Sequence, residues 1–176
     1  MASNNQRLTA FAPIEAADAR VLILGSMPSQ ESLKQQAYYA HPRNQFWKIV
    51  CHLLHGTCPV AYSERCAILV ENGIALWDVL ESCRREGSAD TAIRDEVPND
   101  FQSFIMGHPR LETVLCNGSK SYQLYNKYIL GSRDGQGLPR QLQLMRLPST
   151  SPAHAVAFEE KLEAWRAAFV VAGLIK

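Results

Sequence analysis

The stretch RVLILGSMPSQESLKQQAYYAHPRNQFW, residues Arg20–Trp47, decides the fold and contains most of the candidate functional residues. Its apolar run Val21–Leu24 has the aliphatic and β-branched composition of a strand that is buried on both faces of a parallel sheet. The segment Gly25–Ser29 (GSMPS) follows directly and predicts a tight turn at the carboxyl end of that strand. Open α/β sheets bind their ligands at this edge, so the sequence places a candidate ligand site there.

The second half of the stretch, Tyr38–Trp47 (YYAHPRNQFW), is rich in aromatic and amide side chains. Such side chains stack on flat heterocycles or form hydrogen bonds with them. Pro42 disfavours helix at the residue before it, and Asn44 then fits the N-cap of a helix over Asn44–His55. We therefore expect the Asn44 amide at a helix start that faces the Gly25 turn.

The rest of the chain alternates predicted strands and helices, without an internal repeat or a linker. Further strands are predicted over residues 74–80, 111–116 and 141–147, and further helices over residues 30–37, 61–72, 99–106, 119–130 and 157–172. Residues 131–139, with three glycines and a proline, are expected to form a mobile surface loop. The pattern predicts a single α/β domain, residues 1–176, built as a three-layer α/β/α sandwich around a central four-stranded parallel sheet.

The composition, with 47% hydrophobic residues over 176 positions, is that of a globular chain. There is no run of 18 apolar residues, and the start MASNNQRLTAFAP lacks the order of a secretory signal. We therefore expect no membrane attachment and a cytoplasmic location, associated with the nucleoid if the protein is bacterial. The five cysteines contain no CxxC pair, which favours reduced thiols over disulfides, a zinc site or an iron–sulfur cluster. No metal or organic cofactor is expected.

The net charge of +1 excludes the globally basic surface of proteins that bind nucleic acid mainly by neutralising phosphates. Composition alone therefore does not indicate DNA. An enzyme that captures one flipped nucleotide can instead rely on a local basic rim and on backbone amides.

Two motifs in a fixed order carry a resemblance to a known family. GSMPS and YYAHPRNQFW, followed much later by LPSTSPAH at Leu147–His154, resemble the uracil-DNA glycosylase superfamily, and within it the hypoxanthine-DNA (deoxyinosine) glycosylase branch. The similarity covers about residues 21–174. It implies the α/β/α fold given above and an enzyme of base-excision repair. Such an enzyme flips a deaminated base out of double-stranded DNA and hydrolyses its N-glycosidic bond.

The resemblance further implies that the enzyme is monofunctional and leaves an abasic site. Neither Lys34 nor Lys48 matches a motif position for Schiff-base chemistry, so strand cleavage is not expected. The partner is double-stranded DNA that contains a deaminated base, and we expect the protein to act as a monomer.

Asn44 is the candidate catalytic residue that the resemblance assigns. As the N-glycosidic bond breaks, the sugar becomes oxocarbenium-like and the base gathers negative charge, which requires a held water and donors around the base. Many superfamily members hold the water with an Asp or Asn in the first loop, where this chain has Met27. We therefore expect Asn44 to position or polarise the water. From the residues alone Asn44 also fits a simple helix cap, and both roles can coexist.

The candidate base-binding residues are Gly25, Ser26, Met27, Tyr39 and Asp78. Gly25 and Ser26 offer backbone amides and a hydroxyl. Tyr39 lies where related enzymes stack an aromatic ring on the base, although loop packing would also explain it. Asp78 lies where related enzymes end their second strand with a residue that reads the base edge. A carboxylate accepts from a purine N–H but repels a departing anion, so Asp78 can instead orient neighbouring loops.

The second motif supplies the candidate DNA contacts. Ser149 and Ser151 can donate to phosphate oxygens, while Ala153 and His154 lie where a wedge would enter the minor groove. Ala153 is small for a wedge. A Ser/Pro-rich turn before a helix is the purely structural alternative for this segment.

Three other functions stay open on the sequence. One is uracil excision from G:U mismatches, and a second is a catalytically silent nucleic-acid-binding module, which Met27 in the first loop favours. The third is an unrelated small-molecule α/β hydrolase, for which the chain offers neither a GxSxG elbow nor a Ser-His-Asp order.

Overall fold

Four parallel strands form the central sheet of the computed structural model, which describes residues 7–131 and 138–176. In sheet order they are β3 (Ile74–Asp78), β2 (Val21–Gly25), β6 (Thr113–Asn117) and β7 (Gln143–Leu147). All residues of β2 are buried, as the apolar run predicted, because β2 lies between β3 and β6. The predicted four-stranded parallel sheet is confirmed. Most of the loop predicted at residues 131–139 lies outside the described residues.

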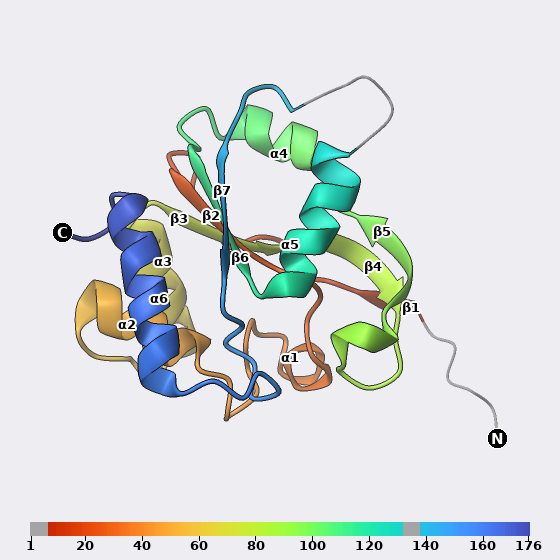
Figure 1. Ribbon diagram of the computed structural model, residues 1–176, viewed down its shortest axis with the longest axis horizontal. Coiled ribbons are helices and arrows are strands. Elements are labelled where there is room, and N and C mark those ends of the chain that lie inside the picture. The colour runs from red at the N-terminus through yellow and green to blue at the C-terminus, as the bar shows by residue number, and fades with distance from the viewer. Residues whose placement is uncertain (1–6, 132–137) are drawn as a thin grey trace.

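Helices cover both faces of this sheet (Figure 1). They are α1 (Gln30–Gln35), α2 (Phe46–His55), α3 (Tyr62–Glu71), α4 (Phe101–Gly107), α5 (Ser119–Tyr125), which continues as a π-helical segment (Asn126–Leu130), and α6 (Phe158–Val171). Successive side chains of a strand point to opposite faces. Val21 and Ile23 therefore pack with α2, α3 and α6, whereas Leu22 and Leu24 pack with α4 and α5. This is the predicted three-layer sandwich.

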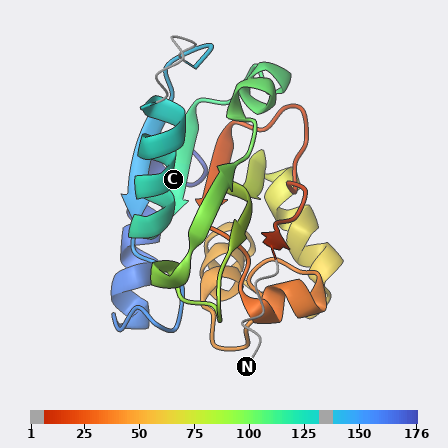
Figure 2. The same cartoon turned by 90° about the vertical axis from the view of Figure 1, so that its right-hand side faces the viewer.

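A second sheet of three short antiparallel strands corrects the sequence prediction. Its order is β1 (Arg7–Thr9), β4 (Leu80–Arg84) and β5 (Arg94–Pro98). The strand predicted over residues 74–80 ends at Asp78, and Leu80 already belongs to β4. The segment that forms β4 and β5 is rich in charged residues, so hydrophobic periodicity did not reveal it. Figure 2 shows the β4–β5 hairpin, in green, facing the viewer.

Glu96 ties this hairpin to the helical layer around α5. Its carboxylate accepts hydrogen bonds from Lys120 Nζ at 3.1 Å, Lys127 Nζ at 2.8 Å and the Tyr128 hydroxyl at 2.7 Å. Burial alone would raise the pKa of Glu96. The three donors lower the pKa by more than burial raises it, so that it falls to about 2. These bonds therefore fix the β4–β5 hairpin relative to the central sheet. The tip of the hairpin lies at the carboxyl edge of that sheet.

Helix ends differ from the predicted ones by up to two residues. The helix predicted to end at residue 37 ends at Gln35, because Gln36 adopts a left-handed conformation with φ 52°. The helix predicted from Asn44 begins at Phe46, after Gln45 with ψ 0°. Strands β6 and β7 each begin two residues later than predicted.

Two searches of the described residues bear on the function classes. Over residues 7–131 and 138–176, no helix has both the length and the apolar character needed to cross a membrane. Over the same ranges, no group of three or more His, Cys, Asp or Glu side chains is placed to hold a metal ion.

Candidate active site

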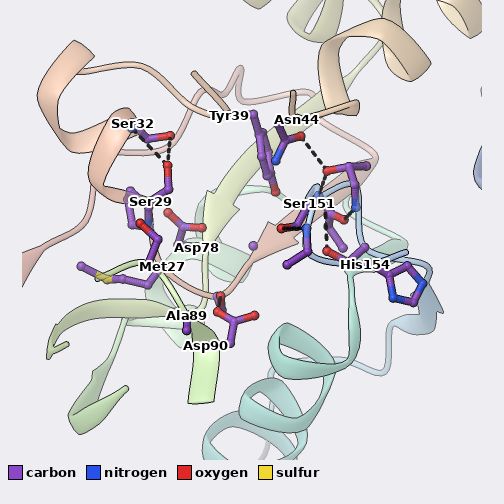
Figure 3. Close-up of a pocket in the computed structure, with 18 of the residues that line it drawn as sticks. Met27, Ser29, Ser32, Tyr39, Asn44, Asp78, Ala89, Asp90, Ser151 and His154 are labelled. Atoms are coloured by element: carbon purple, nitrogen blue, oxygen red, sulfur yellow. Dashed lines mark hydrogen bonds between the residues drawn. The ribbon is translucent and has the colours of Figure 1, made fainter. Parts of the chain in front are cut away.

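Loops at the carboxyl ends of the parallel strands enclose a cavity of about 430 Å³, which is within the range of small-molecule sites. The carboxyl ends of the strands face down in Figure 1, and Figure 3 shows side chains that line the cavity. All ten predicted site residues line it: Gly25, Ser26, Met27, Tyr39, Asn44, Asp78, Ser149, Ser151, Ala153 and His154. The two motifs, more than 100 residues apart in the sequence, thus form one site.

The GSMPS turn is held by the tip of the β4–β5 hairpin. Ser26 Oγ donates to Asp90 Oδ1 at 2.7 Å, and the backbone N–H of Gln30 donates to Ser88 Oγ at 2.9 Å. Met27 is only 7% exposed and packs into the core on the α4–α5 face. In Figure 3 its side chain points away from Tyr39.

Gly25 and Asp78 are paired at the ends of β2 and β3. A Cβ atom on Gly25 would collide with Asp78 Oδ1 and would lie 3.1 Å from the Tyr39 hydroxyl. Glycine therefore makes room for two polar groups at the floor of the cavity. Asp78 is 3% exposed, and its Oδ2 has no hydrogen-bond partner among the described residues. Burial, partly offset by Arg85 and reinforced by Asp90, raises the pKa of Asp78 to about 7.

Tyr39 presents one face of its ring to the cavity. Its other face stacks on Phe46, with ring centroids 4.1 Å apart and an interplanar angle of 25°. Its φ of 53° lies in the left-handed region, which is uncommon for a residue with a side chain. The preceding Tyr38 holds this conformation: its carbonyl accepts from Trp47 Nε1 at 2.8 Å, and its N–H donates to the Tyr62 hydroxyl at 3.0 Å. The Tyr39 hydroxyl is buried without a partner in the described chain, and burial raises its pKa.

Asn44 connects the start of α2 to the loop that follows β7. Its Oδ1 accepts from the Phe46 backbone N–H and from Thr150 Oγ1, both at 2.9 Å. Gln45, not Asn44, occupies the N-cap position, so the predicted cap is shifted by one residue. The Asn44 side chain nevertheless accepts one of the free N–H groups of the first turn, as a capping side chain does.

The loop after β7 is anchored by side chains from β6 and α6. Thr150 is fully buried, and its N–H donates to Asn117 Oδ1 at 2.9 Å, while Asn117 Nδ2 donates to Thr150 Oγ1 at 2.9 Å. Lys161 on α6 is 1% exposed, and its Nζ donates to the Ser151 carbonyl at 3.3 Å. Burial lowers the pKa of Lys161. This contact ties the loop to α6.

The outer part of this loop faces solvent. Ser149 Oγ accepts from the Ser151 N–H, and Ser151 Oγ accepts from the Ala153 N–H, both at 3.2 Å. Each hydroxyl keeps its own hydrogen for a further acceptor. Ala153 and His154 are exposed at the rim of the cavity.

A family model described as the Uracil DNA glycosylase superfamily matches residues 12–171. The chain belongs to this superfamily. A solution NMR structure of a candidate uracil DNA glycosylase from Methanosarcina acetivorans matches the fold with a TM-score of 0.78 at 32% identity. The match covers 96% of this chain and 99% of that one. The family and the fold that the motifs predicted are confirmed.

Two curated relatives are similar to this superfamily member over much of their length. A protein named hypoxanthine DNA glycosylase from Methanosarcina acetivorans is 35% identical over 153 residues, which cover 86% of this chain and 91% of the relative. A protein of the same name from Methanosarcina barkeri is 38% identical over 112 residues, which cover 63% of this chain and 71% of the relative.

Sequence reasoning missed three parts of this uracil-DNA glycosylase superfamily site. Asn117 is a polar residue at the end of a buried strand, as Asp78 is, but the sequence analysis does not select it. Thr150 lay inside the second motif between two serines that were selected. The hairpin tip, residues 88–91, gave no signal because the hairpin itself was not predicted.

Asp78 should make the stability of this superfamily member depend on pH. Its pKa is about 7 in the folded state, above the ordinary value of 3.8 that applies to the unfolded chain, so the folded state binds an extra proton between these pH values. The free energy of unfolding should therefore fall as pH rises from 4 to 7, by at most about 1.4 kcal/mol per pH unit. Asp78→Asn cannot ionise and should lose this slope.

Chemical denaturation of both proteins from pH 4 to pH 8 measures the effect. The variant should gain stability relative to the wild type as pH rises, whereas Asp18→Asn, at an exposed position, should not. A difference between wild type and Asp78→Asn that is constant with pH would contradict the burial of an ionisable carboxyl.

Proposed function

We propose that this protein is a monofunctional DNA glycosylase of base-excision repair that removes hypoxanthine from deoxyinosine in double-stranded DNA and leaves an abasic site. The observation that carries the proposal is the pair of buried polar atoms without partners, Asp78 Oδ2 and the Tyr39 hydroxyl, at the floor of a cavity with an aromatic wall. The names of the two relatives from Methanosarcina support the same substrate.

The unpartnered atoms at the floor match the edge of a flipped base. A buried polar group without a partner costs about 1–3 kcal/mol, and a bound ligand that pairs with it recovers this free energy. Hypoxanthine carries a ring N–H next to a carbonyl oxygen. A neutral carboxyl group can accept from the first and donate to the second. Asp78, with a pKa of about 7, supplies this neutral form near pH 7 without repelling a base that leaves with negative charge.

The remaining walls fit the other demands of the reaction. The free face of Tyr39 provides a stacking surface for a base that has left the helix. Asn44 is the catalytic residue and contacts the reacting nucleotide. Ser149 and Ser151 bind phosphate from the exposed loop, while Ala153 and His154 enter the space beside the flipped nucleotide. We further propose that the protein acts as a cytoplasmic monomer whose single domain spans residues 1–176.

Uracil is the second candidate substrate. It also carries a ring N–H beside a carbonyl oxygen, so the Asp78 carboxyl fits its edge as well. The similarity to the candidate uracil DNA glycosylase from Methanosarcina acetivorans favours this alternative. A cavity of about 430 Å³ can hold either a purine or a pyrimidine. Its contacts with the base, and not its size alone, therefore determine which base is bound.

Excision assays with matched duplexes test the substrate. Duplexes that carry one deoxyinosine or one deoxyuridine are incubated with the protein, and abasic sites are revealed with alkali. We expect strand breaks with deoxyinosine that appear only after alkali, because neither Lys34 nor Lys48 matches a motif position for the Schiff-base chemistry that would cleave the strand. Preferential breaks at deoxyuridine would mean that the substrate base is uracil and not hypoxanthine. A folded protein that cleaves neither duplex would instead be a binding module.

Tyr39 tests the stacking surface. Tyr39→Ala should weaken capture of the base by roughly 5- to 150-fold, because stacking on an aromatic ring contributes about 1–3 kcal/mol per base. Tyr39→Phe keeps the ring and removes only the hydroxyl, so it should retain most of the capture. The concentration dependence of single-turnover excision measures capture, and thermal denaturation checks the fold of both variants. Equal capture by the alanine variant and the wild type would return Tyr39 to a packing role.

A further inference from the structure

The amide of Asn44 has a fixed orientation in the cavity. The oxygen and nitrogen of an asparagine side chain are often exchanged in assignment, so the orientation has to follow from the partners. A backbone N–H can only donate. The atom of Asn44 that lies 2.9 Å from the Phe46 N–H must therefore be the oxygen. By the same argument, the atom of Asn117 that lies 2.9 Å from the Thr150 N–H is its oxygen.

These two backbone donors set the direction of a hydrogen-bond chain through Asn117, Thr150 and Asn44. The nitrogen of Asn117 donates to Thr150 Oγ1 at 2.9 Å. The Thr150 hydroxyl therefore directs its own hydrogen to Asn44 Oδ1, also at 2.9 Å. Together with the Phe46 N–H, this bond occupies both lone pairs of that oxygen.

The nitrogen of Asn44 is the group that remains for a ligand. Asn44 Nδ2 makes no hydrogen bond within the described part of the chain, and Asn44 lines the cavity. In Figure 3 the oxygen of Asn44 faces the loop that carries Ser151, and the nitrogen is on the side of Tyr39. The free N–H groups are therefore available to a ligand in the cavity, which the Tyr39 ring also lines.

We propose that Thr150 and Asn117 are positioning residues that hold Asn44 as a hydrogen-bond donor to the leaving base, instead of as an acceptor for the attacking water. This inference rests on the proposed glycosylase function. Thr150 and Asn117 act through Asn44 and do not touch the substrate in this role. In this proposal the Asn44 side chain contacts the base, whereas the sequence analysis expects it to position or polarise the water.

The donor role fits the movement of charge in the reaction. The C1′–N bond breaks and its electron pair passes to the base, while the water oxygen bonds to C1′ and releases a proton to solvent. The base later takes up a proton from solvent, and Asn44 keeps both of its hydrogens. A donor that is already oriented toward the base stabilises the negative charge as it forms, without reorganisation during the step. Thr150, which is fully buried, excludes water that would compete for Asn44 Oδ1.

Two nearly isosteric substitutions of Thr150 test the positioning role. Thr150→Val removes the hydroxyl and leaves Asn44 free to rotate, so we expect single-turnover excision of hypoxanthine to slow by about 10- to 100-fold, somewhat less than the loss of a whole transition-state donor. Thr150→Ser keeps the hydroxyl and should restore the rate to near the wild-type value. Affinity for a duplex with an abasic site should be similar in all three proteins.

The outcomes separate this inference from the proposed function. An active wild type with an equally active Thr150→Val variant would overturn the positioning role alone. Equal losses in Thr150→Val and Thr150→Ser would also overturn it, since the hydroxyl would then not be the group that matters. A wild type that releases no base from deoxyinosine would refute the proposed function, and with it this inference.

Asn44→Asp tests the donor role if Thr150→Val does not fold. An ionised carboxyl at this position only accepts, whereas a protonated carboxyl can donate again. The rate of the variant relative to the wild type should therefore rise as pH falls from 8 to 5. A residue that accepts from water would give the opposite slope, because the ionised form would be the active one. Asp78, Asp90 and His154 are ionisable and line the same cavity in both proteins, so any effect of pH on them is common to both rates. The ratio of the two rates therefore isolates the effect of residue 44.

Discussion

Because the four strands of the central sheet are parallel, all of their carboxyl ends meet at one edge, and every wall of the cavity depends on this constraint. The position of β2 between β3 and β6 places Gly25 directly beside Asp78. The absence of a side chain at Gly25 lets the Asp78 carboxyl and the Tyr39 hydroxyl reach the floor of the cavity. The turn after β2, the loop after β6 and the loop after β7 then form the walls around them.

The site combines polar groups without partners with loops that are firmly anchored. Asp78 Oδ2 and the Tyr39 hydroxyl are buried and unpaired within the described chain, at a cost to stability that a bound base edge would offset. The surrounding backbone is held by Tyr38, by the paired side chain of Asn117 and by the buried side chain of Lys161. Such anchoring keeps the groups that meet the substrate in place before it binds, so that little reorganisation is needed during the reaction.

The sequence predicted those parts of the structure that local patterns determine. The apolar run of β2 predicted a strand buried on both faces, and the family motifs, which are local stretches of sequence, identified Asp78 as a candidate base-binding residue. The β4–β5 hairpin was not predictable, because its charged sequence lacks the alternation of a strand that covers a core. The chain from Asn117 through Thr150 to Asn44 joins residues that are 33 and 106 positions apart, and its direction follows only from two backbone N–H groups. No local pattern contains that information.

The most direct test of the account is the crystal structure of Asn44→Ala, chosen to slow excision, bound to a duplex with one deoxyinosine. The account predicts that the deoxyinosine leaves the helix and stacks on the free face of Tyr39. Its ring N–H and carbonyl oxygen should lie within hydrogen-bond distance of the Asp78 carboxyl. A deoxyinosine that stays in the helix, or a flipped base whose edge points away from Asp78, would contradict the account.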